Sequence, residues 1–181
     1  DYARRHGAPC VAVVPTVLDL ARYSSPEPDR TPTRAGPPRI VWIGSPATVH
    51  YLQLLAAPLR VLAQRTSYVL RIIGGGAINM PGVSTEVVPW SEEGEVNGIA
   101  VCDVGVMPLL DSDWERGKCG YKLIQYMACG LPVVASNVGV NPQIVQSDVN
   151  GFIASSDEEW VAALQRLLGD RFGCRLGGRR S

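Results

Sequence analysis

Two lysines and a glutamine lie close together in the stretch GKCGYKLIQYMACGLPVVAS, Gly117 to Ser136. The stretch predicts a helix in which Lys122 and Gln125, three residues apart, share one face. A lysine near the start of a helix opposes the helix dipole at a cost of roughly a few tenths of a kcal/mol, which a bound anion would offset. Lys118, Lys122 and the backbone N–H groups of the loop can thus converge on a phosphate, while Gln125 hydrogen-bonds a sugar hydroxyl. A solvated lysine and a surface glutamine are the alternative interpretation.

Three other segments carry residues that suit a bound ligand. Gly44 lets a ligand approach the backbone after a predicted strand, and Ser45 supplies a hydroxyl at the start of a helix, although ordinary capping also explains this pattern. Trp90 ends another predicted strand, where it either stacks on a nucleobase or covers the core. Gly139 can expose backbone N–H groups to a ligand, and Asn141 either contacts that ligand or caps the next helix.

Motifs of fixed spacing for phosphate or metal are incomplete. In IIGGGAINMPG (72–82), Asn79 stands where the third glycine of G-x-G-x-x-G belongs, and the phosphate-loop lysine is missing. This pattern favours a tight turn over ligand contact. Asp111 and Asp113 form a D-S-D sequence that favours a solvated turn over Mg²⁺ binding. We therefore expect neither a metal site nor a cofactor.

Apolar runs and amphipathic segments alternate along the chain. Strands are predicted at 10–15, 39–44, 67–74, 83–90, 103–109, 132–136 and 150–154, with helices at 48–65 (kinked by Pro58), after Ser91, around Lys122, at 140–146 and at 157–170. This alternation predicts an α/β domain: a parallel sheet with helices on both faces. Such sheets bind ligands at the carboxyl ends of their strands, where the strand order reverses. The loops after Gly44, Gly74, Trp90, Leu109 and Ser136 therefore carry the candidate site.

The composition is that of a globular domain. The 181 residues are 46% hydrophobic and 19% charged with zero net charge, which allows a core and argues against a nucleic-acid partner. Five cysteines without a C-x-x-C pair predict reduced thiols and a cytoplasmic location. No apolar run is long enough to span a membrane.

Three regions are expected along the chain. Residues 1–38 are expected to hold a strand and a proline-rich linker that follow a further N-terminal domain, because five prolines fall between Asp19 and Pro38. Residues 39–170 form the ligand-binding domain. Residues 171–181 are expected to be a truncated C-terminal helix or tail.

Several runs together resemble the C-terminal domain of the family 4 (group 1) glycosyltransferases: VVPTVLD, WIGSP, DVGVMPL, KCGYKLIQYMACGLPVVASNVGVN, NGFIA and EEW. The resemblance covers about Val11 to Asp170, and the order and spacing of the runs make it specific. It implies a Rossmann-like domain, one half of a GT-B fold, that holds a nucleotide-sugar donor without a metal. By that resemblance Lys122 and Lys118 hold the donor diphosphate and act in catalysis.

The chain departs from that family at the two ends of its E-x7-E motif. Gln125 occupies the position of the second glutamate, which binds ribose in the family. The first glutamate falls at Gly117, and Glu115, two residues earlier, is the nearest substitute. These departures leave the sugar contact and the identity of the donor open.

The resemblance implies the donor-binding half of an enzyme that moves a sugar from a nucleoside diphosphate to an acceptor, in cell-envelope or polysaccharide synthesis. The acceptor, a carbohydrate or a lipid-linked sugar, would bind a missing N-terminal half, so this piece alone is expected to be inactive. A lipid-linked acceptor would bring the full-length protein to the inner face of the membrane. The alternatives are a nucleotide-sugar epimerase of the same fold, for which ionisable groups are scarce, and a degenerate domain that binds a nucleotide or a partner without turnover.

Overall fold

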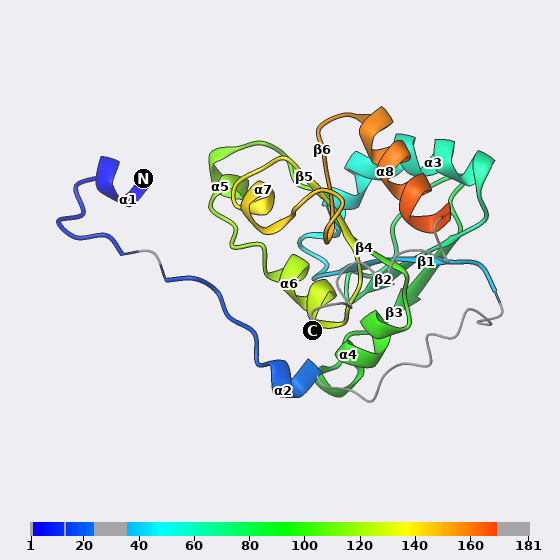
Figure 1. The fold of residues 1–181 in the computed structure, drawn as a ribbon, viewed down its shortest axis with the longest axis horizontal. Coiled ribbons are helices and arrows are strands. Elements are labelled where there is room, and N and C mark those ends of the chain that lie inside the picture. Colours follow the sequence, from blue (N-terminus) through cyan, green and yellow to red (C-terminus); the bar gives the residue numbers. More distant parts are fainter. Residues whose placement is uncertain (1, 13, 24–35, 170–181) are drawn as a thin grey trace.

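Six parallel strands form a single sheet in the computed structural model, which describes residues 2–12, 14–23 and 36–169 (Figure 1). The strands are β1 (Arg39–Ile43), β2 (Val69–Ile73), β3 (Thr85–Val88), β4 (Val104–Met107), β5 (Val133–Ser136) and β6 (Gly151–Ala154). Their spatial order is β3-β2-β1-β4-β5-β6. This is the doubly wound Rossmann order, and its direction reverses between the neighbours β1 and β4. The predicted fold class is confirmed.

Helices cover both faces of the sheet (Figure 1). Helices α3 (Ala56–Arg65) and α8 (Asp157–Gly169) pack together on one face, and α4 (Glu92–Ala100) and α6 (Tyr121–Ala128) lie on the other. The short elements are α1 (Tyr2–Arg5), α2 (Leu20–Tyr23), the 3₁₀ helix η1 (Val49–Leu55), α5 (Asp113–Arg116) and α7 (Asn141–Ile144).

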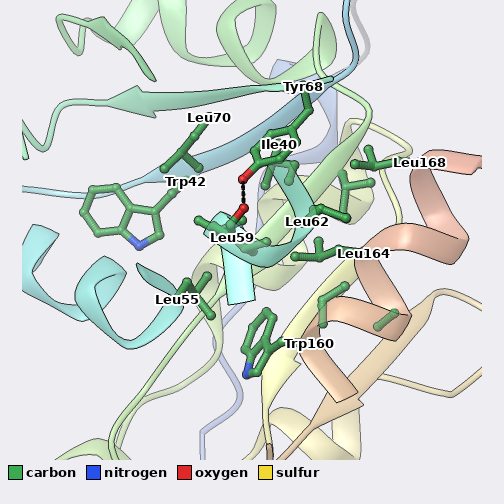
Figure 2. Packing of buried hydrophobic residues seen from close by; sticks show 14 of the residues in the cluster. Ile40, Trp42, Leu55, Leu59, Leu62, Tyr68, Leu70, Trp160, Leu164 and Leu168 are labelled. Carbon is green, nitrogen blue, oxygen red and sulfur yellow. Dashed lines mark hydrogen bonds between the residues drawn. The ribbon is translucent and has the colours of Figure 1, made fainter. Parts of the chain in front are cut away.

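Each face of the sheet buries its own apolar cluster. Figure 2 shows the cluster beneath α3 and α8, where Leu59 and Leu62 pack near Leu164. The Tyr68 hydroxyl donates a 2.6 Å hydrogen bond to the carbonyl oxygen of Leu59 at the edge of this cluster (Figure 2). Alternate residues of β1 point to opposite clusters, so Trp42 lies in this one. Burial on both faces explains why the strands read as continuous apolar runs.

The helix predicted at 48–65 is two helices. Its apolar positions, Leu52, Leu55, Leu59 and Leu62, are fully buried as expected. Residues 49–55 adopt the 3₁₀ form, however, and the α-helix begins only at Ala56. Pro58 therefore lies in the first turn of α3 and does not kink a helix interior, because the N–H groups of a first turn have no partner within the helix.

The strand predicted at 10–15 is wrong for the described residues of that range. The sheet offers the segment no neighbouring strand, and Val14 is 85% exposed. A run of valines forms a strand only where a partner supplies hydrogen bonds and a packing surface. The predicted linker also packs more than expected, because Tyr23 of α2 is buried against the domain. The predicted tail at 171–181 lies outside the described residues.

Candidate functional site

The two lysines of the chain lie together at the reversal point of the sheet. Lys118 belongs to the loop that follows β4, and Lys122 to the first turn of α6, which packs on β4 and β5. The ammonium nitrogen of Lys122 lies 5.7 Å from the ring centroid of Trp42 at the end of β1. The predicted cationic site therefore spans the carboxyl ends of β1 and β4, where doubly wound sheets bind ligands.

Lys122 carries a half-buried charge. Within the described ranges its ammonium group makes no hydrogen bond or ion pair. Burial first, and the nearby Lys118 charge second, lower the pKa of Lys122 below that of a free lysine. A cation in this environment favours a bound anion, since an anion would compensate both effects.

Lys118, by contrast, is held by a chain of buried side chains. Its ammonium nitrogen lies 4.1 Å from the ring centroid of Tyr51 in η1 and donates a 2.9 Å hydrogen bond to the Tyr51 hydroxyl. The Tyr51 hydroxyl donates in turn to the carboxylate of Glu115, and the Ser112 hydroxyl donates to the other carboxylate oxygen. Both Tyr51 and Glu115 are 6% exposed. These four residues form the Lys118–Tyr51 relay.

The relay changes the role expected for Glu115. Its two carboxylate oxygens accept hydrogen bonds inside the protein, and these bonds, from Ser112 first and Tyr51 second, lower its pKa. Glu115 is therefore directed toward Lys118 through Tyr51 and is not presented to a sugar. Sequence reasoning missed Tyr51, although a tyrosine at an apolar helix position signals a hydroxyl that needs a buried partner.

Gln125 also points into the protein. It is 4% exposed, and its side-chain amide donates a 3.0 Å hydrogen bond to the Tyr23 hydroxyl. The Tyr23 hydroxyl donates to Glu95 at 2.6 Å, and the Trp90 indole N–H donates to the other oxygen of Glu95 at 2.8 Å. The expectation that Gln125 shares an accessible face with Lys122 is therefore wrong. The segment around Tyr23, 102 residues away in sequence, occupies its amide.

Trp90 is not a core residue. It is 53% exposed, while the hydrogen bond to Glu95 fixes the edge of its indole ring. Its Cβ lies 2.9 Å from the position that a side chain at Gly74 would take, so the loops after β2 and β3 meet here. An exposed ring with an anchored edge offers a stacking surface at the carboxyl edge of the sheet.

Gly44 and Ser45 form the turn between β1 and η1. A Cβ added at Gly44 would stand 2.4 Å from the ring of Trp42, so this glycine makes room for the tryptophan. The Gly44 N–H donates to the carbonyl oxygen of Ile73 at 3.0 Å. Ser45 is exposed, and its backbone N–H donates to the Thr48 hydroxyl at 3.2 Å. Gly44 thus has a packing role, while Ser45 is exposed at the carboxyl end of β1.

Gly139 and Asn141 hold loops together. Gly139 has φ +59°, and an added Cβ would stand 2.9 Å from the carbonyl oxygen of Arg116. Asn141 is 1% exposed and donates a 3.0 Å hydrogen bond to the carbonyl oxygen of Ser136. The cap of α7 is Val140, so the prediction that Asn141 caps this helix is wrong. Gly139 thus lets the loops after β4 and β5 approach closely, while Asn141 fixes the turn that follows β5.

Asp111 and Asp113 are paired with an arginine. The guanidinium group of Arg116 donates to both oxygens of Asp111, at 2.6 and 3.0 Å, and lies 3.5 Å from Asp113. These hydrogen bonds lower the pKa of Asp111. Among the residues that the structure describes, no group of acidic, histidine or cysteine side chains is arranged to hold a metal ion. Over the same ranges, no helix has the length and apolar character needed to cross a membrane.

A family model described as "Glycosyl transferases group 1" matches residues 37–170. The chain belongs to the group 1 glycosyltransferases. A curated relative, the D-inositol 3-phosphate glycosyltransferase of Xylanimonas cellulosilytica, is 28% identical over 192 residues, covering 94% of this chain and 46% of the relative. This chain therefore spans about half the length of that relative.

Solved structures share the fold of this group 1 glycosyltransferase domain. The sucrose-phosphate synthase of Thermosynechococcus elongatus matches with a TM-score of 0.65 and 18% identity over 94% of this chain and 47% of its own. Anabaena Alr3699/HepE, solved in complex with UDP and glucose, matches with a TM-score of 0.60 and 17% identity over 84% of this chain and 46% of its own. This chain thus matches about half of each of these solved chains, and the matched part has a Rossmann-like fold.

Proposed function

We propose that this domain binds the nucleotide-sugar donor of a glycosyltransferase, with the donor diphosphate against Lys122 and Lys118. The observation that carries the proposal is the half-buried Lys122 ammonium, which has no counter-charge among the described residues and lies at the reversal point of the sheet. An unpaired charge in such a place is costly unless a ligand compensates it. Anabaena Alr3699/HepE has the same fold and was solved in complex with UDP and glucose and with UDP-glucose. These complexes support the choice of a nucleoside diphosphate.

The two lysines would act on the leaving group of the transfer. The bond between the anomeric carbon of the sugar and the diphosphate oxygen breaks, and the electron pair leaves with the diphosphate. The acceptor hydroxyl oxygen forms the new bond to that carbon, and its proton passes to the departing diphosphate. Positive charge that is already positioned near the diphosphate stabilises the negative charge that develops there in the transition state. The exposed face of Trp90 suits the base of the same nucleotide.

The remainder of the full-length protein would bind the acceptor, a carbohydrate or a lipid-linked sugar. A lipid-linked acceptor would bring the protein to the inner face of the membrane, in cell-envelope or polysaccharide synthesis. A cytoplasmic location is part of this proposal, because free thiols such as those of the exposed Cys10 and Cys119 persist in a reducing compartment. On this proposal, residues 1–38 connect the acceptor-binding part to the donor-binding domain.

Calorimetric titration of the chain with UDP, GDP and ADP, first without metal and then with Mg²⁺, tests the donor site. A parallel experiment labels lysines with an amine-specific reagent and reads the sites by mass spectrometry, which is simple because the chain has two lysines. We expect one nucleotide to bind saturably and to protect Lys122 from labelling. A folded chain that binds none of the three, with unprotected lysines, would contradict the proposal.

A further inference from the structure

The Lys118–Tyr51 relay joins the two segments that follow the neighbouring strands β1 and β4. Tyr51 comes from η1, after β1, whereas Ser112, Glu115 and Lys118 come from the segment after β4. The hydrogen bonds between them span 64 and 67 residues of sequence. The relay therefore fixes the position of Lys118 relative to the end of β1, across the point where the strand order reverses.

We propose that Tyr51 is a positioning residue for the donor site: its hydroxyl couples the buried Glu115 carboxylate to Lys118 and holds that ammonium group where it meets the donor diphosphate. This inference rests on the proposed function, because it assigns a task to Lys118. Tyr51 itself need not touch the nucleotide. Its role is exerted through the lysine.

The direction of the hydrogen bonds follows from the number of protons available. A tyrosine hydroxyl has one proton, and Tyr51 donates it to the Glu115 carboxylate, which can only accept. The lone pairs of the hydroxyl are then left for Lys118, which can only donate. The carboxylate thus accepts, the ammonium group donates, and the hydroxyl does both. This fixed direction holds the ammonium group in one place.

The burial of Glu115 gives the relay its electrostatic effect. A carboxylate that is 6% exposed needs donors, and Ser112 and Tyr51 supply one to each oxygen. Its negative charge faces Lys118 through a single hydroxyl. Lys118 is thereby compensated while Lys122 is not, so the relay lets two like charges remain close together at the carboxyl edge of the sheet. The structure thus places a fixed lysine, whose charge is compensated, beside a lysine whose charge is not.

Tyr51→Phe removes the hydroxyl and keeps the ring. We expect it to weaken binding of the nucleotide that the wild-type chain prefers by about three- to tenfold, the worth of one ordinary hydrogen bond, because the effect reaches the nucleotide only through Lys118. Lys118→Ala should weaken binding by at least as much. In the double variant the losses should not add, because Tyr51 acts only through Lys118.

Tyr68→Phe is the matched control. Tyr68 is also buried, at 4% exposure, and its hydroxyl likewise donates a hydrogen bond, to the carbonyl oxygen of Leu59 (Figure 2). It precedes β2, however, and so lies at the opposite edge of the sheet from the carboxyl ends. We expect this variant to lose stability and to retain the nucleotide affinity of the wild type.

A second readout needs no nucleotide. Isotope labelling of lysine gives two side-chain signals in the NMR spectrum, one for each lysine. Tyr51→Phe should shift the Lys118 signal of the ligand-free chain much more than the Lys122 signal, and Tyr68→Phe should shift neither.

The two readouts separate the possible failures. An unmoved Lys118 signal in folded Tyr51→Phe would overturn the relay, whatever binds. A moved signal with unchanged nucleotide affinity, or with losses that add in the double variant, would overturn the positioning role. If Tyr51→Phe moves the Lys118 signal but the wild-type chain binds no nucleotide, the relay stands as a contact. The proposed function is then overturned, and with it the task assigned to Tyr51.

Discussion

Replacing Lys122 by methionine should make the domain a weaker binder and a more stable protein at once. Methionine keeps much of the length and apolar character of the lysine side chain and removes the ammonium group. Lys122→Met should weaken nucleoside diphosphate binding at least about tenfold, equivalent to about 1.4 kcal/mol.

The magnitude follows from the surroundings of the ammonium group. Two opposite unit charges about 4 Å apart attract by about 4 kcal/mol near a protein surface, and desolvation of the phosphate offsets part of this. Hydrogen bonds to charged groups retain about 1.5–3 kcal/mol net. Because Lys122 is half-buried without a counter-charge among the described residues, much of its own desolvation has already occurred on folding.

The same burial determines the sign of the effect on stability. The folded-state pKa of Lys122 is lowered, by burial and then by Lys118, so the unfolded chain binds more protons in the window between the folded and unfolded pKa values. Stability therefore rises with pH through that window, and below it the buried charge is a constant cost. Removing an uncompensated charge of this kind is worth on the order of 1 kcal/mol. Lys122→Met should then raise the Tm by about 2–4 °C near neutral pH.

Ligand binding should depend on pH in the opposite sense. A bound diphosphate favours the charged lysine and raises the lowered pKa of Lys122, so the complex takes up a proton. Wild-type affinity should fall as the pH rises from the ligand-free pKa toward the pKa in the complex. Measurements above about pH 8, two units above the second pKa of about 6 of a phosphate group, isolate this effect from titration of the ligand. The fall should be smaller in Lys122→Met.

Arg60→Met is the matched control for the loss of one positive charge. Arg60 is exposed on α3, so its removal should change neither nucleotide affinity nor Tm appreciably. Calorimetry gives the affinities, and thermal unfolding monitored by circular dichroism gives the Tm values. Unchanged affinity in a folded Lys122→Met variant would refute the assignment of this lysine to the diphosphate. A lower Tm would refute the claim that its charge is uncompensated.

Three further substitutions examine the surroundings of the site. Tyr23→Phe should lower the free energy of unfolding by about 1–2 kcal/mol in a urea titration, because it removes a hydroxyl that donates to the buried Glu95; an unchanged midpoint would show that this bond contributes nothing. Gly139→Ala should lower the Tm by several degrees, since its φ of +59° and the Arg116 carbonyl oxygen 2.9 Å away both oppose a side chain; full stability would mean that the loop yields freely. Asp111→Asn should leave nucleotide affinity within about twofold, with or without Mg²⁺, because Arg116 already holds this carboxylate; a loss seen only with Mg²⁺ would instead assign a metal to the D-S-D turn.

The class of the fold and the position of the cationic site follow from the sequence. Continuous apolar runs between amphipathic segments predict a parallel sheet covered on both faces, and β1 to β6 all fall within predicted strands. The lysines are predicted at a carboxyl edge because they lie between one strand and the next. Local patterns suffice for these conclusions. The spacing of apolar residues, and the alternation of strands with helices along the chain, can both be recognised from residues that are close in sequence.

Only the tertiary structure decided which way each polar side chain faces. Gln125 and Lys122 lie three residues apart on one helix, yet the amide is buried against Tyr23 while the ammonium is left without a counter-charge among the described residues. The partner of Gln125 lies 102 residues away in sequence. No local pattern predicts such a pair, because it exists only after α2 packs on the domain.

Glu115 makes the same point for the candidate site. Its spacing in the sequence suggests a substitute for a sugar-binding glutamate, but folding brings Tyr51 of η1 and Ser112 to its two oxygens. The cost of burying a carboxylate without donors favours this arrangement over one that faces the ligand. The sequence by itself determined that both lysines of the chain follow β4, next to the carboxyl edge of the sheet. The sheet order, which makes β1 and β4 neighbours, decided that one lysine is fixed by a buried carboxylate and the other has no counter-charge among the described residues.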